Sequence, residues 1–128
     1  MPPSFEITDE LYLYEVFEDS VVPLLKSRHA FVRDNFYSAA LAVREGKLYS
    51  NEGWTHSDGS PLVGWVKRHL ASPIAFLQFG DDPVAYENPH FKRLLQNAVH
   101  WAASEDARAW ARESGQNAGS DPNGAKSA

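Results

Sequence analysis

Residues 72–103, SPIAFLQFGDDPVAYENPHFKRLLQNAVHWAA, constrain the fold most strongly, because they combine a short apolar run with a long amphipathic stretch. The run 73–77 is nearly all apolar and has no alternating polar face. Such runs are typical of strands covered on both sides, as in parallel sheets. The turn-forming residues 80–83, Gly-Asp-Asp-Pro, then end the strand.

A helix is predicted to begin at Asn88-Pro89. Asn88 can accept a hydrogen bond from a first-turn N–H, and Pro89 suits the first helical position because no donor is needed there. Apolar side chains then follow at the spacing of one helical face: Phe91, Leu94, Leu95, Ala98, Trp101 and Ala102. Burying each large side chain stabilises the fold by roughly 1.5–3 kcal/mol, so we expect this helix to cover a sheet.

Four other segments have the aromatic and β-branched content of strands: 11–16, 21–25, 36–43 and 61–68. A short helix over 8–13 competes with the first of them. Pro23 predicts an edge position or a bulge for the second. A parallel sheet needs crossover helices between its strands, and no convincing helix precedes residue 89.

Towards the C-terminus, residues 105–113 are expected to form a short second helix or to continue the first. Residues 114–128 contain no large apolar side chain, so we expect a disordered tail. The expected domain therefore covers residues 4–113.

The composition excludes several classes of protein. With a formal net charge of −5, the chain lacks the clustered positive charge that nucleic-acid binding requires. No apolar run approaches the ~20 residues that span a bilayer, and the N-terminus does not resemble a signal peptide. The chain has no cysteine, which excludes disulfides, thiolate metal sites and a thiol nucleophile. We expect a cytoplasmic protein without a membrane partner.

Several motifs together resemble a known family. The segments DELYLYE, GWTH, LVGWVKR and SPIAFLQFGDDPVAYENPHFKRLLQNAVHWAA are similar to the C-terminal half of the ThuA-like (trehalose utilisation) domain. The resemblance covers about residues 4–110. It implies an α/β, flavodoxin-like fold of the class I glutamine amidotransferase-like superfamily. The N-terminal βαβ units of that family have no counterpart here, so the resemblance also implies a truncated domain.

The resemblance implies a role in the utilisation of trehalose, other disaccharides or keto-sugars. Related amidotransferases use a cysteine nucleophile, and a chain without cysteine is not expected to be a glutaminase. Whether the chain is an enzyme stays open. The alternatives are a non-catalytic sugar-binding or regulatory module, and an inactive fragment.

The DELY segment supplies the first candidate residues. Asp9 and Glu10 are adjacent, so a strand would point their side chains to opposite faces, which disfavours a paired acid–base role. A turn or a helix start accounts for two acidic residues here without any catalytic role. By resemblance, however, this segment lies near the family's site. Asp9 and Glu10 are therefore candidate catalytic residues, and Tyr12 is a candidate substrate-binding residue.

Trp54 and His56 lie in a glycine-containing loop, where binding residues are often placed. Trp54 could stack on a sugar ring, and His56 could donate or accept a proton as a catalytic residue. Without function, Trp54 would cover the edge of the core and His56 would be solvated. No third ligand accompanies His56 and Asp58, so no metal site is predicted.

The end of the strand at 73–77 supplies the remaining candidates. Ligands in open α/β sheets bind at the carboxyl ends of strands, which favours Gln78, Gly80 and Asp81 as substrate-binding residues. A turn that needs glycine and a local hydrogen bond explains the same residues. His90, in the first turn of the predicted helix, is either a further binding residue or a surface residue.

The predicted partners are a small-molecule sugar and either a second copy of the chain or a missing N-terminal half. A half-sheet would expose unpaired strand edges and an apolar face, and we expect one of these two partners to cover them. No cofactor is predicted.

Overall fold

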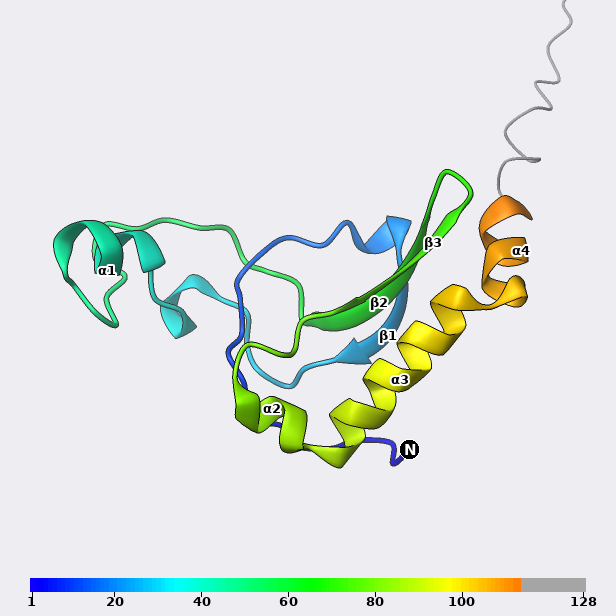
Figure 1. Cartoon of the computed structure of the whole chain (residues 1–128). Coiled ribbons are helices and arrows are strands. Elements are labelled where there is room, and N and C mark those ends of the chain that lie inside the picture. Colours follow the sequence, from blue (N-terminus) through cyan, green and yellow to red (C-terminus); the bar gives the residue numbers. More distant parts are fainter. Residues whose placement is uncertain (114–128) are drawn as a thin grey trace, which may run out of the picture.

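The computed structural model describes residues 1–113, and the predicted tail at 114–128 lies outside the described residues. The described part has mixed α/β architecture, with one three-stranded sheet and four α-helices (Figure 1). In chain order the elements are η1 (Glu18–Ser20), β1 (Val22–Lys26), η2 (Arg33–Asn35), α1 (Ala39–Glu45), β2 (Leu62–His69), β3 (Ser72–Leu77), α2 (Pro83–Glu87), α3 (Pro89–Ala103) and α4 (Glu105–Glu113). No helix within residues 1–113 is long and apolar enough to cross a membrane.

The three strands are antiparallel in the order β1-β2-β3. The predictions for 61–68 and 73–77 are confirmed as strands, but the predicted parallel pairing of the second is wrong. His69 pairs with Ser72, so only two residues connect β2 to β3, and such a short connection can join only antiparallel strands. β3 is also an edge strand, whereas the predicted strand would be central in a parallel sheet.

The prediction of a strand at 21–25 with an edge position or a bulge is confirmed, because β1 has both. β1 lies at the other edge of the sheet, and its register with β2 shifts between Pro23 and Leu25 and again between Leu25 and Lys26. Proline lacks the N–H that a central strand must donate, which explains why it occurs on the strand at this edge.

Two predicted strands are absent. The segment predicted as a strand at 36–43 instead forms α1, because Ser38 accepts a hydrogen bond from the N–H of Leu41 (3.4 Å) and Gly46 ends the helix at φ 67°. Residues 11–16 form neither a strand nor the alternative helix. The backbone of this segment is hydrogen-bonded to the loop before β2, where the N–H of Ser60 donates to the carbonyl of Tyr14 (3.2 Å). This contact is not part of a sheet ladder.

α3 begins at Asn88-Pro89 as predicted. The Asn88 side chain accepts hydrogen bonds from the N–H groups of His90 (2.9 Å) and Phe91 (3.2 Å). α4 is a separate helix, because Ser104 leaves the helical region at ψ 154° and its hydroxyl accepts from the N–H of Ala107 (3.1 Å). The alternative of one continuous helix is thereby excluded.

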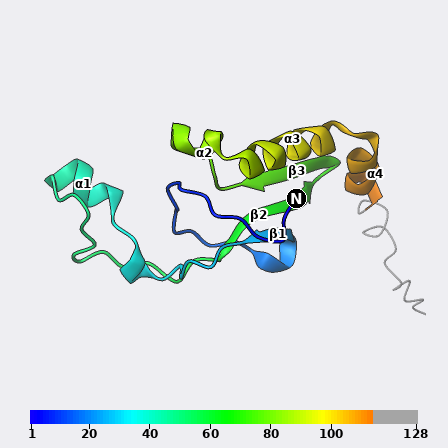
Figure 2. The same ribbon diagram turned by 90° about the horizontal axis from the view of Figure 1, so that it is seen from below.

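Both C-terminal helices pack against β3, and β1 lies farthest from α3 (Figure 2). The predicted apolar stripe of α3 is therefore covered only in part. Phe91 is buried, at 2% exposure, whereas Leu95 remains 38% exposed.

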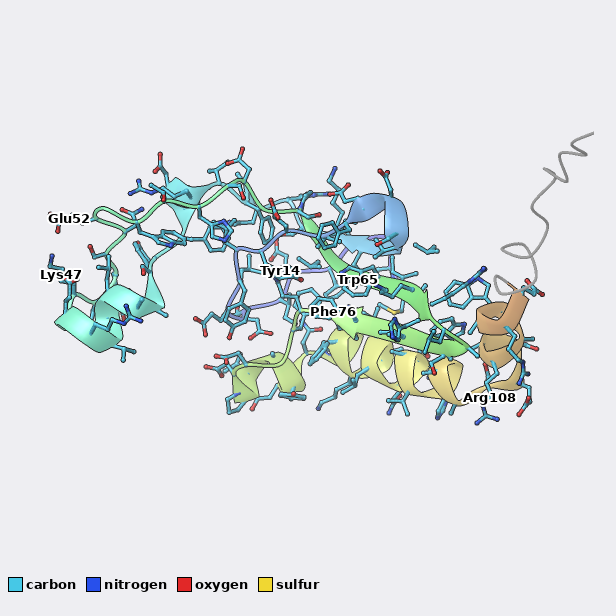
Figure 3. The ribbon with its side chains drawn as sticks, turned by 90° about the horizontal axis from the view of Figure 1, so that it is seen from above. Tyr14, Lys47, Glu52, Trp65, Phe76 and Arg108 are labelled. Carbon is cyan, nitrogen blue, oxygen red and sulfur yellow. The ribbon has the colours of Figure 1, made fainter. Side chains whose placement is uncertain are left out.

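The other face of the sheet is covered by the N-terminal segment. Trp65 stacks on Phe76 at 4.6 Å between ring centroids, and Tyr14 meets Phe76 edge-on at 5.9 Å (Figure 3). Nearby, Phe31, Phe36 and Val63 form a buried cluster. α1 lies away from the sheet, at the end of a long excursion between β1 and β2 (Figure 1).

Candidate functional site

The carboxylate of Asp9 binds the backbone of the turn that follows β3. It accepts hydrogen bonds from the N–H groups of Gly80 (2.6 Å), Asp81 (3.3 Å) and Asp82 (3.4 Å). It also accepts from the N–H of Glu10 (2.9 Å). A carboxylate is well suited to this task, because two oxygens can satisfy several N–H donors at once.

The hydroxyl of Tyr12 lies between two carboxylates. It is 3.0 Å from Oδ1 of Asp81 and 3.2 Å from Oε2 of Glu10. A phenol has one proton, so it can donate to only one of these acceptors at a time. The hydrogen bond to Asp81, followed by desolvation and by the hydrogen bond to Glu10, raises the pKa of Tyr12 to about 12.

Gln78 completes this group from the end of β3. Its side chain is buried, and its Nε2 donates to the carbonyl of Tyr12 (3.0 Å). Its Oε1 is buried and has no hydrogen-bond partner within residues 1–113. We call Asp9, Glu10, Tyr12, Gln78, Gly80 and Asp81 the clasp, because they join the N-terminal segment to the end of β3.

Gly80 makes room for the side chain of Tyr86 on α2. Its φ is +115°, and a Cβ placed there would lie 2.6 Å from the hydroxyl of Tyr86. A residue with a side chain would therefore be strained in its backbone and would collide with Tyr86.

The structure thus brings together six of the nine residues singled out from the sequence. Their roles differ, however. The carboxylate of Asp9 is occupied by backbone donors, which is a structural task. The carboxylates of Glu10 and Asp81 meet at the exposed hydroxyl of Tyr12, where a ligand could reach them.

Trp54 and His56 form a second group, on the loop before β2. Their ring centroids are 5.5 Å apart. Trp54 is half-buried against the Phe31–Phe36–Val63 cluster, and its carbonyl accepts from Nε of Arg33 (2.9 Å). His56 is exposed, with Nδ1 2.6 Å from the carbonyl of Ser57. Trp54 therefore does cover the edge of the core, as its non-functional explanation requires.

His90 lies at the start of α3. It is half-buried, and its ring lies 5.5 Å from that of Phe5. The neighbouring Asn88 donates through Nδ2 to the carbonyl of Glu6 (2.7 Å). His90 and Asn88 thus help to hold the N-terminal segment against α3.

The described residues contain no group of three or more histidine and acidic side chains that could hold a metal ion. The sequence did not predict the contribution of Tyr86 or the second contact of Asn88. The contact of Asn88 with Glu6 depends on the path of the N-terminal segment, for which the sequence has no local signal. The contact of Tyr86 with Gly80 depends on how α2 packs against the turn after β3.

Scanning the chain against protein-family models, curated proteins and solved structures gives no match.

Proposed function

We propose that this chain is a ThuA-like carbohydrate-utilisation protein that binds trehalose, another disaccharide or a keto-sugar at the clasp. The observation that supports the proposal is the meeting of Glu10, Tyr12 and Asp81 at an exposed point. Two carboxylates can accept hydrogen bonds from neighbouring sugar hydroxyls, and a few such polar groups fix the orientation of a ligand. The sequence resemblance implies the same substrate class.

A catalytic role is a further part of the proposal, and it requires His56, which lies outside the clasp beside Trp54, to come within hydrogen-bond reach of the bound sugar. The alternative of a non-catalytic sugar-binding or regulatory module is favoured by the use of Asp9. A carboxylate that holds four backbone N–H groups is not free to act as a general base. An inactive fragment is the second alternative.

The finer fold assignment also belongs to the proposal. Residues 4–113 would represent the C-terminal half of a flavodoxin-like domain. The observed sheet is antiparallel throughout, so a parallel portion of such a domain would have to come from outside residues 1–113. The proposed location is the cytoplasm, with which the absence of cysteine is compatible.

Titration of the isotope-labelled chain with trehalose, sucrose and fructose, followed by amide chemical shifts, tests the proposal. We expect one of these sugars to shift the amides of residues 9–12 and 78–82. Glu10→Gln should weaken that binding about tenfold, because it replaces a charged acceptor by a neutral one. Asp58→Asn, a matched change at an exposed residue of the Trp54 loop, should leave binding unchanged.

The absence of any shift at the clasp at high millimolar sugar would overturn the proposal. Sugar turnover that is lost in His56→Ala would favour the enzyme over the binding module. Binding that is retained without turnover would favour the binding module.

A further inference from the structure

An apolar groove lies between the sheet and the C-terminal helices, away from the clasp. It encloses about 580 Å³. Val22, Leu24 and Val66 line it from the sheet, and Ala98, Trp101 and Trp110 line it from α3 and α4. Its lining includes one charged side chain, that of Asp106. We call it the sheet groove.

The groove is open because α3 and α4 cover β3 and leave β1 exposed on the same face of the sheet. α3 and α4 pack on β3, and a helix about 10 Å wide covers roughly two strands spaced ~4.8 Å apart. β1 is left without a cover, so Val22 is 49% exposed and Leu24, at the bulge, is 55% exposed. These aliphatic side chains form a ridge directly beside the groove.

We propose that the occupant of the sheet groove is the β1 ridge of a second copy of this chain. A ridge next to a groove is self-complementary under a two-fold axis, because each copy can insert its ridge into the groove of the other. Residues 114–128 cannot supply a matching filling, because they contain no large apolar side chain.

Two charges fit the same arrangement. Lys26 ends β1 and pairs with Leu62, at one end of the groove. Asp106 lines the groove from α4, and Trp110 of the same helix contacts Arg68, so Asp106 lies at the other end. Leu62 and Arg68 are six residues apart on β2, about 20 Å, so Lys26 and Asp106 of one copy do not pair. Antiparallel ridges, however, place Lys26 of each copy at the Asp106 end of its partner's groove.

Each chain carries a net charge of −5, so two copies repel one another at long range. Two Lys26–Asp106 pairs across the axis would offset part of this repulsion and fix the register of the two copies. The proposal concerns assembly only and does not depend on the proposed sugar binding.

Sedimentation equilibrium of the full chain over a range of concentrations tests the proposal. We expect a reversible dimer. Leu24→Asp should weaken it at least about tenfold, because it places a charge in the apolar groove. Lys26→Glu and Asp106→Lys should each weaken it about three- to tenfold, and the double variant should return to within about threefold of the original.

Matched controls separate this effect from a general change in charge. Lys92→Glu on α3 and Glu113→Lys at the end of α4 alter exposed residues outside the groove, and we expect neither to change the dimer. Circular dichroism melts establish that each variant is folded. A chain that stays monomeric up to millimolar concentration would refute the proposal. A dimer that tolerates Leu24→Asp, or that the double charge swap fails to restore, would refute it as well.

Discussion

The carboxylate of Asp9 offers the sharpest test of how the N-terminal segment is held. In Asp9→Ala, three backbone N–H groups after β3 lose their acceptor. We expect the folded state to be destabilised even when no sugar is present, because the role derived from the structure is one of binding the backbone.

The size of the effect follows from the three contacts. The N–H of Gly80 is partly buried and lies 2.6 Å from the carboxylate, and a hydrogen bond to a charged group contributes about 1.5–3 kcal/mol. The contacts of Asp81 and Asp82 are exposed and longer, at 3.3 and 3.4 Å, so water can replace the carboxylate there. We therefore expect a total loss of about 2–3 kcal/mol. Asp9→Asn keeps one oxygen acceptor and should lose about 1 kcal/mol.

Urea unfolding followed by tryptophan fluorescence measures this difference. Asp58→Ala is the matched control, because its carboxylate is exposed and lies on a loop; we expect a change below about 0.5 kcal/mol. If Asp9→Ala left the free energy of unfolding unchanged yet abolished sugar turnover, the structural role would be refuted and the catalytic one supported.

Three further predictions concern the clasp and α3. The pKa of Tyr12 is about 12, above its ordinary value of 10.0, so its contribution to stability should be complete below pH 10 and lost as the pH rises towards 12. Ultraviolet titration of tyrosinate, compared with Tyr12→Phe, should show one group titrating near pH 12, and Asp81→Asn should move it towards 10. Asn88→Ala removes the acceptor for two first-turn N–H groups of α3 and should lower the free energy of unfolding by about 0.5–2 kcal/mol; a smaller loss in thermal melts would contradict the capping role. Phe91→Ala should cost about 3–5 kcal/mol in urea unfolding, because Phe91 is only 2% exposed, and a loss below 1 kcal/mol would show that the helix–sheet contact is not tight.

Local signals in the sequence predicted β2, β3, α3 and α4 correctly. Asn88-Pro89 marks a helix start through contacts within three residues, which is why that boundary could be predicted. The segment at 36–43 was predicted wrongly because Phe36, Tyr37 and Val43 favour a strand. The capping residues Ser38 and Gly46 decided the outcome in favour of a helix.

Strand direction and the clasp were harder to predict. An apolar run such as that of β3 reveals burial but not the direction of its partner, and the better indicator was the short link between His69 and Ser72. The resemblance singled out Asp9, Glu10 and Tyr12, and the position of the turn after β3 singled out Gln78, Gly80 and Asp81. The use of Asp9 as a backbone acceptor for Gly80, however, joins positions 71 residues apart. No periodicity or spacing rule reaches across that separation.

The long sequence separation of the clasp also has a consequence for the order of folding. The β2–β3 hairpin closes through two residues and can form within microseconds, and α3 follows it closely in the chain. The N-terminal segment must instead close a loop of about 70 residues before its hydrogen bonds form. We therefore expect it to dock last and to detach first, with the amides of Gly80 and Asp81 exchanging with solvent ahead of those in the hairpin.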